Sequence, residues 1–386
     1  MFYAWLLLVG CTALAYLSVN RQYAEADRLP TENNKNQIFG ISTIAFIALL
    51  TTLVCFSGLR TYVNDTTAYI LSYENRIPAE LSEIQNIDWA LGANPLFVSF
   101  QIILKAVFSA NAQMFLFISS LITVTLMVVF IRKYADNFGF SIFIFLAFAV
   151  YAFTLPAIKQ SMATAIGIWA VPFHLNGKRF RAVLLIAIAL MVHPYVIVLC
   201  AFVFLQKNVW DKRAVIIIAL TVFFGMTFTT VLSGVLNLTS LIGDEYDIAS
   251  FEGSGINIYR VIVYWVTPVL SYVFRNEIRE RNDKFLNICV NLSFVSACFV
   301  SLAMFGGAIA LGRLANYMDL FTCISLPLIL SLGFSKTSLK PIVNIFAVAG
   351  FCVFYLTYYN KIYTNFFGEM FSDYYYHVPI TELFRG

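Results

Sequence analysis

Apolar segments long enough to cross a lipid bilayer recur along almost the whole of this 386-residue chain. A membrane-spanning helix needs about 20 mainly apolar residues, and stretches such as 112–131 and 286–309 reach that length. Hydrophobic residues make up 60% of the sequence and charged residues 12%, which excludes a soluble globular protein. Because a segment in lipid satisfies its own backbone as a helix, we expect an all-α polytopic transmembrane helical bundle.

The chain is expected to form about 10–12 membrane segments, two of them shorter or broken. Full spans are expected at residues 2–19, 38–56, 112–131, 139–155, 157–175, 213–235, 258–274, 286–309, 314–332 and 342–359. No loop between them exceeds about 40 residues, which is below the usual size of a folded domain. We therefore expect a single integral-membrane domain over residues 1–386, with external loops at about 57–94 and 236–257.

Charged residues in the loops indicate which end of the bundle faces the cytoplasm. Cytoplasmic loops of membrane proteins carry an excess of Lys and Arg, and such residues gather here at 20–37, 132–134, 176–181 and 275–284. The loop 57–94 is mainly acidic, and the loop 236–257 contains no Lys or Arg. We expect the four basic loops inside and the two acidic loops outside.

Two apolar segments do not fit a simple crossing. Residues 95–109 are short and contain Gln101 and Lys105, so a re-entrant or steeply tilted helix is expected there, which keeps the basic loops on one side. Residues 181–206 are interrupted by His193-Pro194, and proline removes a backbone donor and disfavours helix at the residue before it. A helical hairpin bent at this point and a single kinked span are both compatible with the sequence.

Composition also argues against two kinds of site. The seven cysteines lie within or at the edge of apolar segments and form no C-x-x-C pair, so we interpret them as small core residues and expect no metal site. The net charge of +4 comes from short loops that set topology, and it indicates no nucleic-acid partner.

Uncommon polar residues gather at the external end in this topology. A charge at bilayer depth costs about 3 kcal/mol on insertion scales, so it usually faces a cavity or the bundle interior. The set comprises Arg60, Asp65, Lys159, Gln160, His193, Arg313 and Tyr317. Such cations can hold phosphates and stabilise departing negative charge, while a His or Asp accepts the proton of an attacking hydroxyl. Transfer of a sugar from a diphosphate carrier would use this combination.

Each of these residues also has a purely structural interpretation. Arg60 and Arg313 could be interfacial anchors, and Lys159 could extend to the interface from a helix start. Asp65 could cap the helix expected over 66–73, and His193 could be a hydrogen-bonded residue of the bundle. Residue types alone leave both interpretations open.

Five motifs resemble the EpsG-like branch of Wzy-type polysaccharide polymerases. They are GLRTYVNDTTAYILSY (58–73), NPLF (94–97), KQSMATAIGIWAVPFHLNGKRF (159–180), ALMVHPY (189–195) and GRLANYMDL (312–320). That family has an Arg and an Asp-x-x-x-Tyr pair in its first external loop, matched by Arg60, Asp65 and Tyr69. It has a helix that opens with Arg-Gln, which Lys159-Gln160 matches here, and a central helix that ends in a His, which His193 matches. It also has a later Arg-x-x-x-Tyr, which Arg313 and Tyr317 match. Lys159 replaces the usual Arg, which keeps the charge but loses the planar fork.

The resemblance implies a glycosyltransferase of the bacterial cytoplasmic (inner) membrane. It would polymerise polyprenyl-diphosphate-linked oligosaccharide repeat units into exopolysaccharide, capsule or O-antigen at the outer face, with lipid-linked oligosaccharide as both donor and acceptor. A flippase and a chain-length regulator would be its partner proteins within the membrane lipid, and no cofactor, metal or nucleic acid is implied. The implied catalytic residues are His193, Asp65 and Arg313, and the implied substrate-binding residues are Arg60, Tyr69, Lys159, Gln160 and Tyr317.

Two other functions fit the same residues. A transporter or flippase of lipid-linked glycans would use discontinuous helices, for which segments 95–109 and 181–206 are the only sign. A membrane glycosyltransferase that adds a single unit would use the same chemistry as a polymerase, so the sequence does not separate the two.

Overall fold

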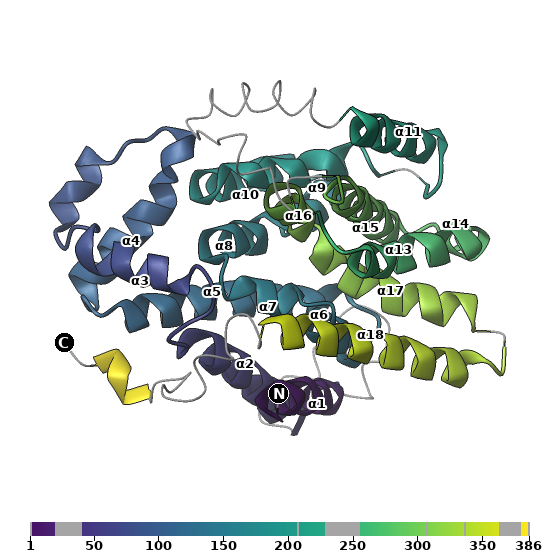
Figure 1. The fold of residues 1–386 in the computed structure, drawn as a ribbon, viewed down its shortest axis with the longest axis horizontal. Helices are drawn as coiled ribbons and strands as arrows, with labels where there is room; N and C mark the ends of the chain where they lie inside the picture. The colour runs from purple at the N-terminus through teal and green to yellow at the C-terminus, as the bar shows by residue number, and fades with distance from the viewer. Residues whose placement is uncertain are drawn as a thin grey trace.

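The fold is a bundle of helices, seen in a computed structural model that describes residues 2–19, 41–206, 208–227, 255–305, 308–335, 337–362 and 380–384 (Figure 1). All regular elements in these ranges are helical, which confirms the expected all-α class. In chain order they are α1 (Phe2–Leu17), α2 (Ile41–Gly58), α3 (Thr66–Asn75), η3 (Leu81–Asn86), η4 (Leu91–Ala93), α4 (Pro95–Val107), α5 (Ala112–Tyr134), α6 (Phe138–Ala147), α7 (Val150–Thr154), α8 (Ile158–Gly167), α9 (Ala170–Leu175), α10 (Arg179–Val192), η5 (Pro194–Val203), α11 (Lys212–Met226), α13 (Ile258–Val273), α14 (Arg275–Arg281), α15 (Lys284–Leu302), α16 (Ala308–Asn316), α17 (Asp319–Gly333), α18 (Lys340–Ile362) and η8 (Ile380–Phe384). The loop expected at 20–37 and most of the one expected at 236–257 lie outside the described residues.

Four of the described helices are long and apolar enough to cross a membrane on their own. They are Ile41–Gly58, Ala112–Tyr134, Lys284–Leu302 and Lys340–Thr357. Shorter apolar helices, among them α13 and α17, pack beside them in the same bundle. The chain is therefore a multi-pass membrane protein, as its composition predicts.

Three of the expected spans are each divided into two helices, and the sequence did not indicate where they break. The span at 139–155 breaks between α6 and α7, where Ala149 adopts a left-handed φ of 66°. The span at 157–175 breaks between α8 and α9, where Pro172 has no N–H to donate to the carbonyl four residues earlier. The span at 314–332 is an elbow: Tyr317 and Met318 join α16 to α17.

The first loop begins and ends on the same side of the bundle, here called the first-loop end. The Gln113 side-chain amide, at the start of α5, donates to the carbonyl oxygens of Gly58 at 2.7 Å and Arg60 at 3.1 Å. Because Gly58 ends α2, the 13-residue helix α4 between these points does not cross the bundle. This agrees with the re-entrant or tilted helix expected at 95–109. Lys105 on α4 binds the end of α3 by donating to the carbonyls of Tyr73, Glu74 and Ile77 at 2.8, 2.9 and 2.8 Å.

Segment 179–206 is a hairpin rather than a single kinked span. Its second arm, η5, returns to the end from which α10 starts, because Gln206 Nε2 lies 2.6 Å from His174 Nε2 at the end of α9. Both arms also approach Gly167 of α8, where an added Cβ would lie 3.1–3.7 Å from Leu199, Val196 and Ala189. The bend falls at His193, whose extended backbone ends α10. His193 therefore lies at the first-loop end.

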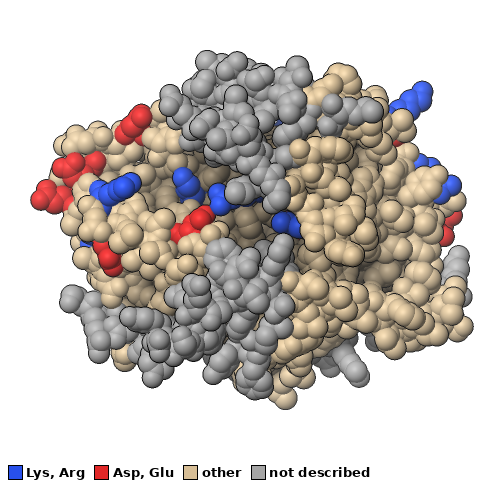
Figure 2. Space-filling view, in the orientation of Figure 1, with Lys and Arg blue, Asp and Glu red and all other residues tan. Residues whose placement is uncertain are grey.

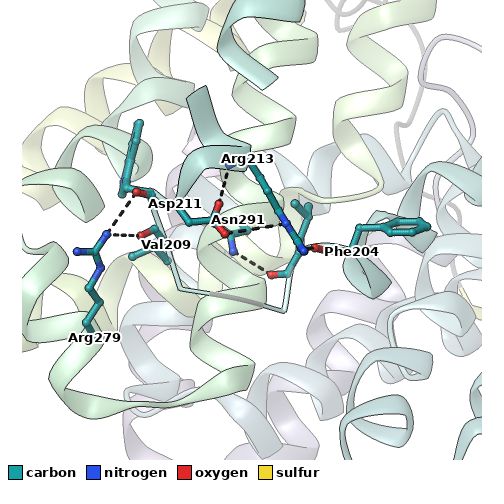
Figure 3. Close-up of polar contacts among 8 residues, drawn as sticks. Phe204, Val209, Asp211, Arg213, Arg279 and Asn291 are labelled. Carbon is teal, nitrogen blue, oxygen red and sulfur yellow. Dashed lines mark hydrogen bonds and ion pairs between the residues drawn. The ribbon is translucent and has the colours of Figure 1, made fainter. Parts of the chain in front are cut away.

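The basic loops meet at the opposite end of the bundle, here called the basic end. The Arg281–Asp136 ion pair of 3.0 Å joins α14 to the loop after α5. Figure 3 shows further contacts there: Arg279 donates to the Val209 carbonyl at 3.1 Å, and Asn291 donates to the Leu205 carbonyl at 2.9 Å. In Figure 1 the first-loop helices α3 and α4 lie at the left and α14 at the right. The basic segments around 132–136 and 275–281 thus share one end, as their charge predicts.

Candidate functional site

Arg60 is the buried anchor of the first-loop end. Its side chain is 1% exposed, so it is not the interfacial anchor that the structural interpretation expected. Its guanidinium donates to the Leu155 carbonyl at 2.5 Å, to Thr66 Oγ1 at 3.2 Å, and to the Ser57 carbonyl. A planar guanidinium with several fixed donors suits this role, because it satisfies acceptors from α2, α3 and the end of α7 at once. Arg60 therefore fixes the start of the first loop.

Asp65 and Arg313 form an ion pair across the site, although 248 residues separate them in sequence. Arg313 Nη2 donates to Asp65 Oδ2 at 2.9 Å, and the two side chains are 43% and 38% exposed. Asp65 does occupy the position before α3, but its carboxylate makes no capping hydrogen bond there. The expected N-cap contact is thus wrong, and the carboxylate instead orients the Arg313 guanidinium.

Tyr69 lies one turn further along α3 and faces the same region. It packs edge-on against Phe97 of α4, with ring centroids 6.2 Å apart. Burial raises the pKa of Tyr69 to about 12, and a hydrogen bond with the Lys159 backbone and the charges of Arg313 and Arg60 oppose that rise. The hydroxyl therefore stays protonated at neutral pH and joins the first loop to the start of α8.

The start of α8 brings Lys159 and Gln160 into the site. Pro156 stands just before the helix and cannot continue α7, so the chain restarts there with its polar residues at the first-loop end. Gln160 is 4% exposed, and its side-chain amide donates to the Arg313 carbonyl at 2.6 Å. This bond fixes the backbone of α16 at the residue whose side chain pairs with Asp65.

His193 meets Tyr317 at the bend of the hairpin. The Tyr317 hydroxyl lies 2.9 Å from His193 Nδ1, and Tyr317 is 1% exposed. Lys159 and Arg313 are near enough to act electrostatically on the imidazole. Burial and the two cations oppose protonation of His193, so the imidazole can accept a proton only when an anion bound to the cations offsets their charge.

The structure thus brings together all eight site residues that the sequence indicated, from four separate segments. Sequence reasoning missed the groups that hold them, Gln113 and Asp319 among them. Gln113 follows the cap residue of α5 and gave no distinct signal. Asp319 is 2% exposed at the start of α17, and a carboxylate inside an apolar segment was the signal that could have revealed it.

One face of the molecule is hollowed. Figure 2 shows the hollow near the middle of the face drawn, with basic side chains at its borders and an acidic side chain beside them. It coincides with the region of Figure 1 where α8 and α16 approach each other, the two helices that the Gln160–Arg313 bond joins. The side chains of Arg313 and Asp65 are 43% and 38% exposed, so a ligand can reach them.

The comparisons with known proteins give one match. A family model described as the EpsG family matches residues 43–375, a range that contains all eight site residues. No curated protein and no solved structure matches the chain.

Proposed function

Because the chain belongs to the EpsG family, we propose that it polymerises polyprenyl-diphosphate-linked oligosaccharide repeat units at the outer face of the bacterial cytoplasmic membrane. It acts as a glycosyltransferase, and its product is an exopolysaccharide, capsule or O-antigen chain. The observation that carries the proposal is the convergence of an imidazole, two cations and a carboxylate at one end of a membrane bundle. The excess of Lys and Arg at the opposite end supports a cytoplasmic location for that end, and we therefore assign this site to the outer face.

Arg313 and Lys159 hold the donor diphosphate in this mechanism. The Arg313 guanidinium is already oriented by Asp65 and is 43% exposed, so it can bind phosphate oxygens without leaving its carboxylate. Arg60 has a different role from the one expected, because its buried guanidinium is bonded to protein oxygens. We assign it to positioning the first loop, with no direct contact to the diphosphate.

His193 is the general base, and Asp65 is the partner of Arg313. In the tautomer that carries its proton on Nδ1, His193 donates to the Tyr317 oxygen and leaves Nε2 free of a proton. Nε2 then accepts the proton of the acceptor sugar hydroxyl. At the same time the oxygen of that hydroxyl forms a bond to the anomeric carbon of the donor sugar. The bond from that carbon to the diphosphate oxygen breaks, and the leaving polyprenyl diphosphate carries away the electron pair. Arg313 and Lys159 stabilise that negative charge.

Tyr69 and Gln160 position the charged residues of the site relative to one another. Gln160 holds the Arg313 backbone, and Tyr69 joins α3 to the Lys159 backbone with a hydroxyl that stays neutral. A displacement of about 1 Å at such positions is enough to cost roughly 100-fold in rate, so both residues are expected to affect catalysis more than substrate affinity.

A transport function remains the second candidate, because α6–α7 and α8–α9 are consecutive broken helices of the kind that many transporters use. The length of the lipid-linked glycan distinguishes the three functions, because a polymerase extends it by many units. A transporter moves the lipid-linked glycan without changing its length, and a single-addition transferase lengthens it by one unit.

The test uses purified protein in vesicles with a fluorescent lipid-linked repeat unit, and the product lengths are measured. We expect a ladder of products that His193→Gln reduces by about 100-fold or more. A product one unit longer and no further would indicate single addition, and movement of unchanged substrate between leaflets would indicate transport. Arg281→Ala serves as the control, because it breaks the 3.0 Å ion pair to Asp136 at the basic end.

A further inference from the structure

A second polar network lies inside the bundle and takes no part in the steps above. Its centre is Asp319, the first residue of α17, which is 2% exposed. The carboxylate accepts hydrogen bonds from Ser296 Oγ at 2.6 Å and from the Tyr264 hydroxyl at 2.8 Å. Arg260 Nη2 donates to the Tyr264 oxygen at 3.3 Å, and its guanidinium lies 5.4 Å from the Tyr264 ring centroid.

This network ties the start of α17 to two other helices. Tyr264 belongs to α13 and Ser296 to α15, so Asp319 joins three helices within the bundle. A buried carboxylate is costly unless it is hydrogen-bonded, and its two donors together with the helix N-terminus supply that stabilisation. The position of the α17 start is therefore set by directional bonds as well as by apolar packing.

Asp319 is joined directly to the catalytic group through the elbow between α16 and α17. Tyr317 and Met318 are the whole connection between the two helices, and both are buried. On one side of the elbow, Tyr317 meets His193 at 2.9 Å and Gln160 holds the Arg313 carbonyl at 2.6 Å. On the other side, Asp319 holds the start of α17. The elbow is thus fixed from both sides.

We propose that Asp319 is a positioning residue that sets the place of Tyr317 and, through it, the orientation and tautomer of His193. The catalytic consequence rests on the proposed function, but the structural consequence does not. Asp319→Asn is the informative variant, because an amide offers one acceptor oxygen where Tyr264 and Ser296 both donate. One of the two hydroxyls must then stop donating or reverse to accept from the amide NH2, and neither remaining bond is to a charged oxygen. We expect the elbow to relax and the 2.9 Å contact at Tyr317 to lengthen.

The structural test is nitrogen NMR of protein labelled at its three histidines in lipid nanodiscs, with His193 assigned by its loss in His193→Gln. We expect wild-type His193 to carry its proton on Nδ1, and we expect both Asp319→Asn and Tyr317→Phe to shift His193 toward mixed tautomers. His174, which contacts Gln206, should not change and serves as the internal control. Unchanged His193 signals in folded Asp319→Asn would overturn the proposal. An Nδ1 without its proton in the wild type would overturn the assignment of the base instead.

The kinetic test is a double-mutant cycle on the transfer rate. We expect Asp319→Asn to lower the rate by about tenfold or more alone and by less than about twofold in the Tyr317→Phe background. Equal losses in both backgrounds would show that Asp319 does not act through Tyr317. If Asp319→Asn does not fold, Ser296→Ala and Tyr264→Phe each remove one donor and keep the carboxylate. Ser325→Ala, at a buried hydroxyl of α17 that has no hydrogen-bond partner within the described residues, is the matched control.

Discussion

Replacing Arg313 separates catalysis from stability more sharply than any other change in the site. In the mechanism above, its guanidinium stabilises the charge that develops on the leaving diphosphate. Arg313→Ala removes that interaction together with the ion pair to Asp65. Arg313→Lys keeps the charge but loses the planar fork, so its rate should lie between those of the wild type and Arg313→Ala.

The expected magnitudes differ by a wide margin. The Arg313–Asp65 pair is 2.9 Å long, but its side chains are 43% and 38% exposed, so solvent screens it. Pairs of this kind contribute about 0.2–1 kcal/mol to stability, which is small against a total of roughly 5–15 kcal/mol. Loss of one preorganised donor at a developing charge lowers the rate by about 100-fold to 1,000-fold, or about 2.7–4 kcal/mol. Reduced folding therefore cannot explain the expected loss of rate.

The assay combines thermal unfolding in nanodiscs with single-turnover extension of a lipid-linked repeat unit. Arg281→Ala is the matched control, since its ion pair to Asp136 is 3.0 Å long, with side chains 25% and 42% exposed. We expect both alanine variants to unfold near the wild-type temperature and only Arg313→Ala to lose transfer. Rates within about threefold of each other in the two variants would refute the role given to Arg313.

Three other changes test the supporting structure. Arg60→Met should lower the free energy of unfolding by about 1–3 kcal/mol for each of the two buried carbonyl oxygens, of Ser57 and Leu155, that lose their donor; wild-type thermal stability would contradict this. Lys105→Met should expose the end of α3 to trypsin at Arg76 while the bundle melts near its usual temperature, and continued resistance at that site would count against the capping role. Burial raises the pKa of Tyr69 to about 12, so the unfolded chain loses the tyrosine proton at a lower pH than the folded protein does. The stability that Tyr69 contributes is therefore complete below about pH 10 and declines between about pH 10 and 12. Burial raises the pKa of Tyr73 to about 12 as well, so Tyr69→Phe should show a smaller alkaline decline than the wild type rather than none. An identical decline in both proteins would contradict the contribution of Tyr69.

The sequence predicts the class of the fold and the place of the site for a common reason: charge is costly in lipid. Lys and Arg in the loops therefore separate the two ends of the bundle, and the end opposite the basic loops collects Arg60, Lys159, His193 and Arg313. A hairpin at 181–206 is one of two interpretations that the sequence leaves open, because a proline breaks a helix without indicating how far the chain turns.

Partners and helix breaks depend on tertiary contacts that no local pattern contains. Asp65 occupies the N-cap position of α3, yet its carboxylate pairs with Arg313 on α16, a helix far away in the sequence. The apolar run at 139–155 carries no sign of the left-handed residue at Ala149 that divides it. Arg60 looks like an interfacial residue in sequence, and only the fold places oxygens from three segments around it.

The most direct test of the proposed function is the size distribution of surface glycan in cells that carry His193→Ala, with the protein level in the membrane measured by blot. The account predicts that the polymer ladder collapses to a single repeat unit on its lipid carrier while the protein level stays normal. An unchanged ladder at normal protein level would contradict the role of His193 as the base, and loss of even single repeats from the outer surface would point to transport.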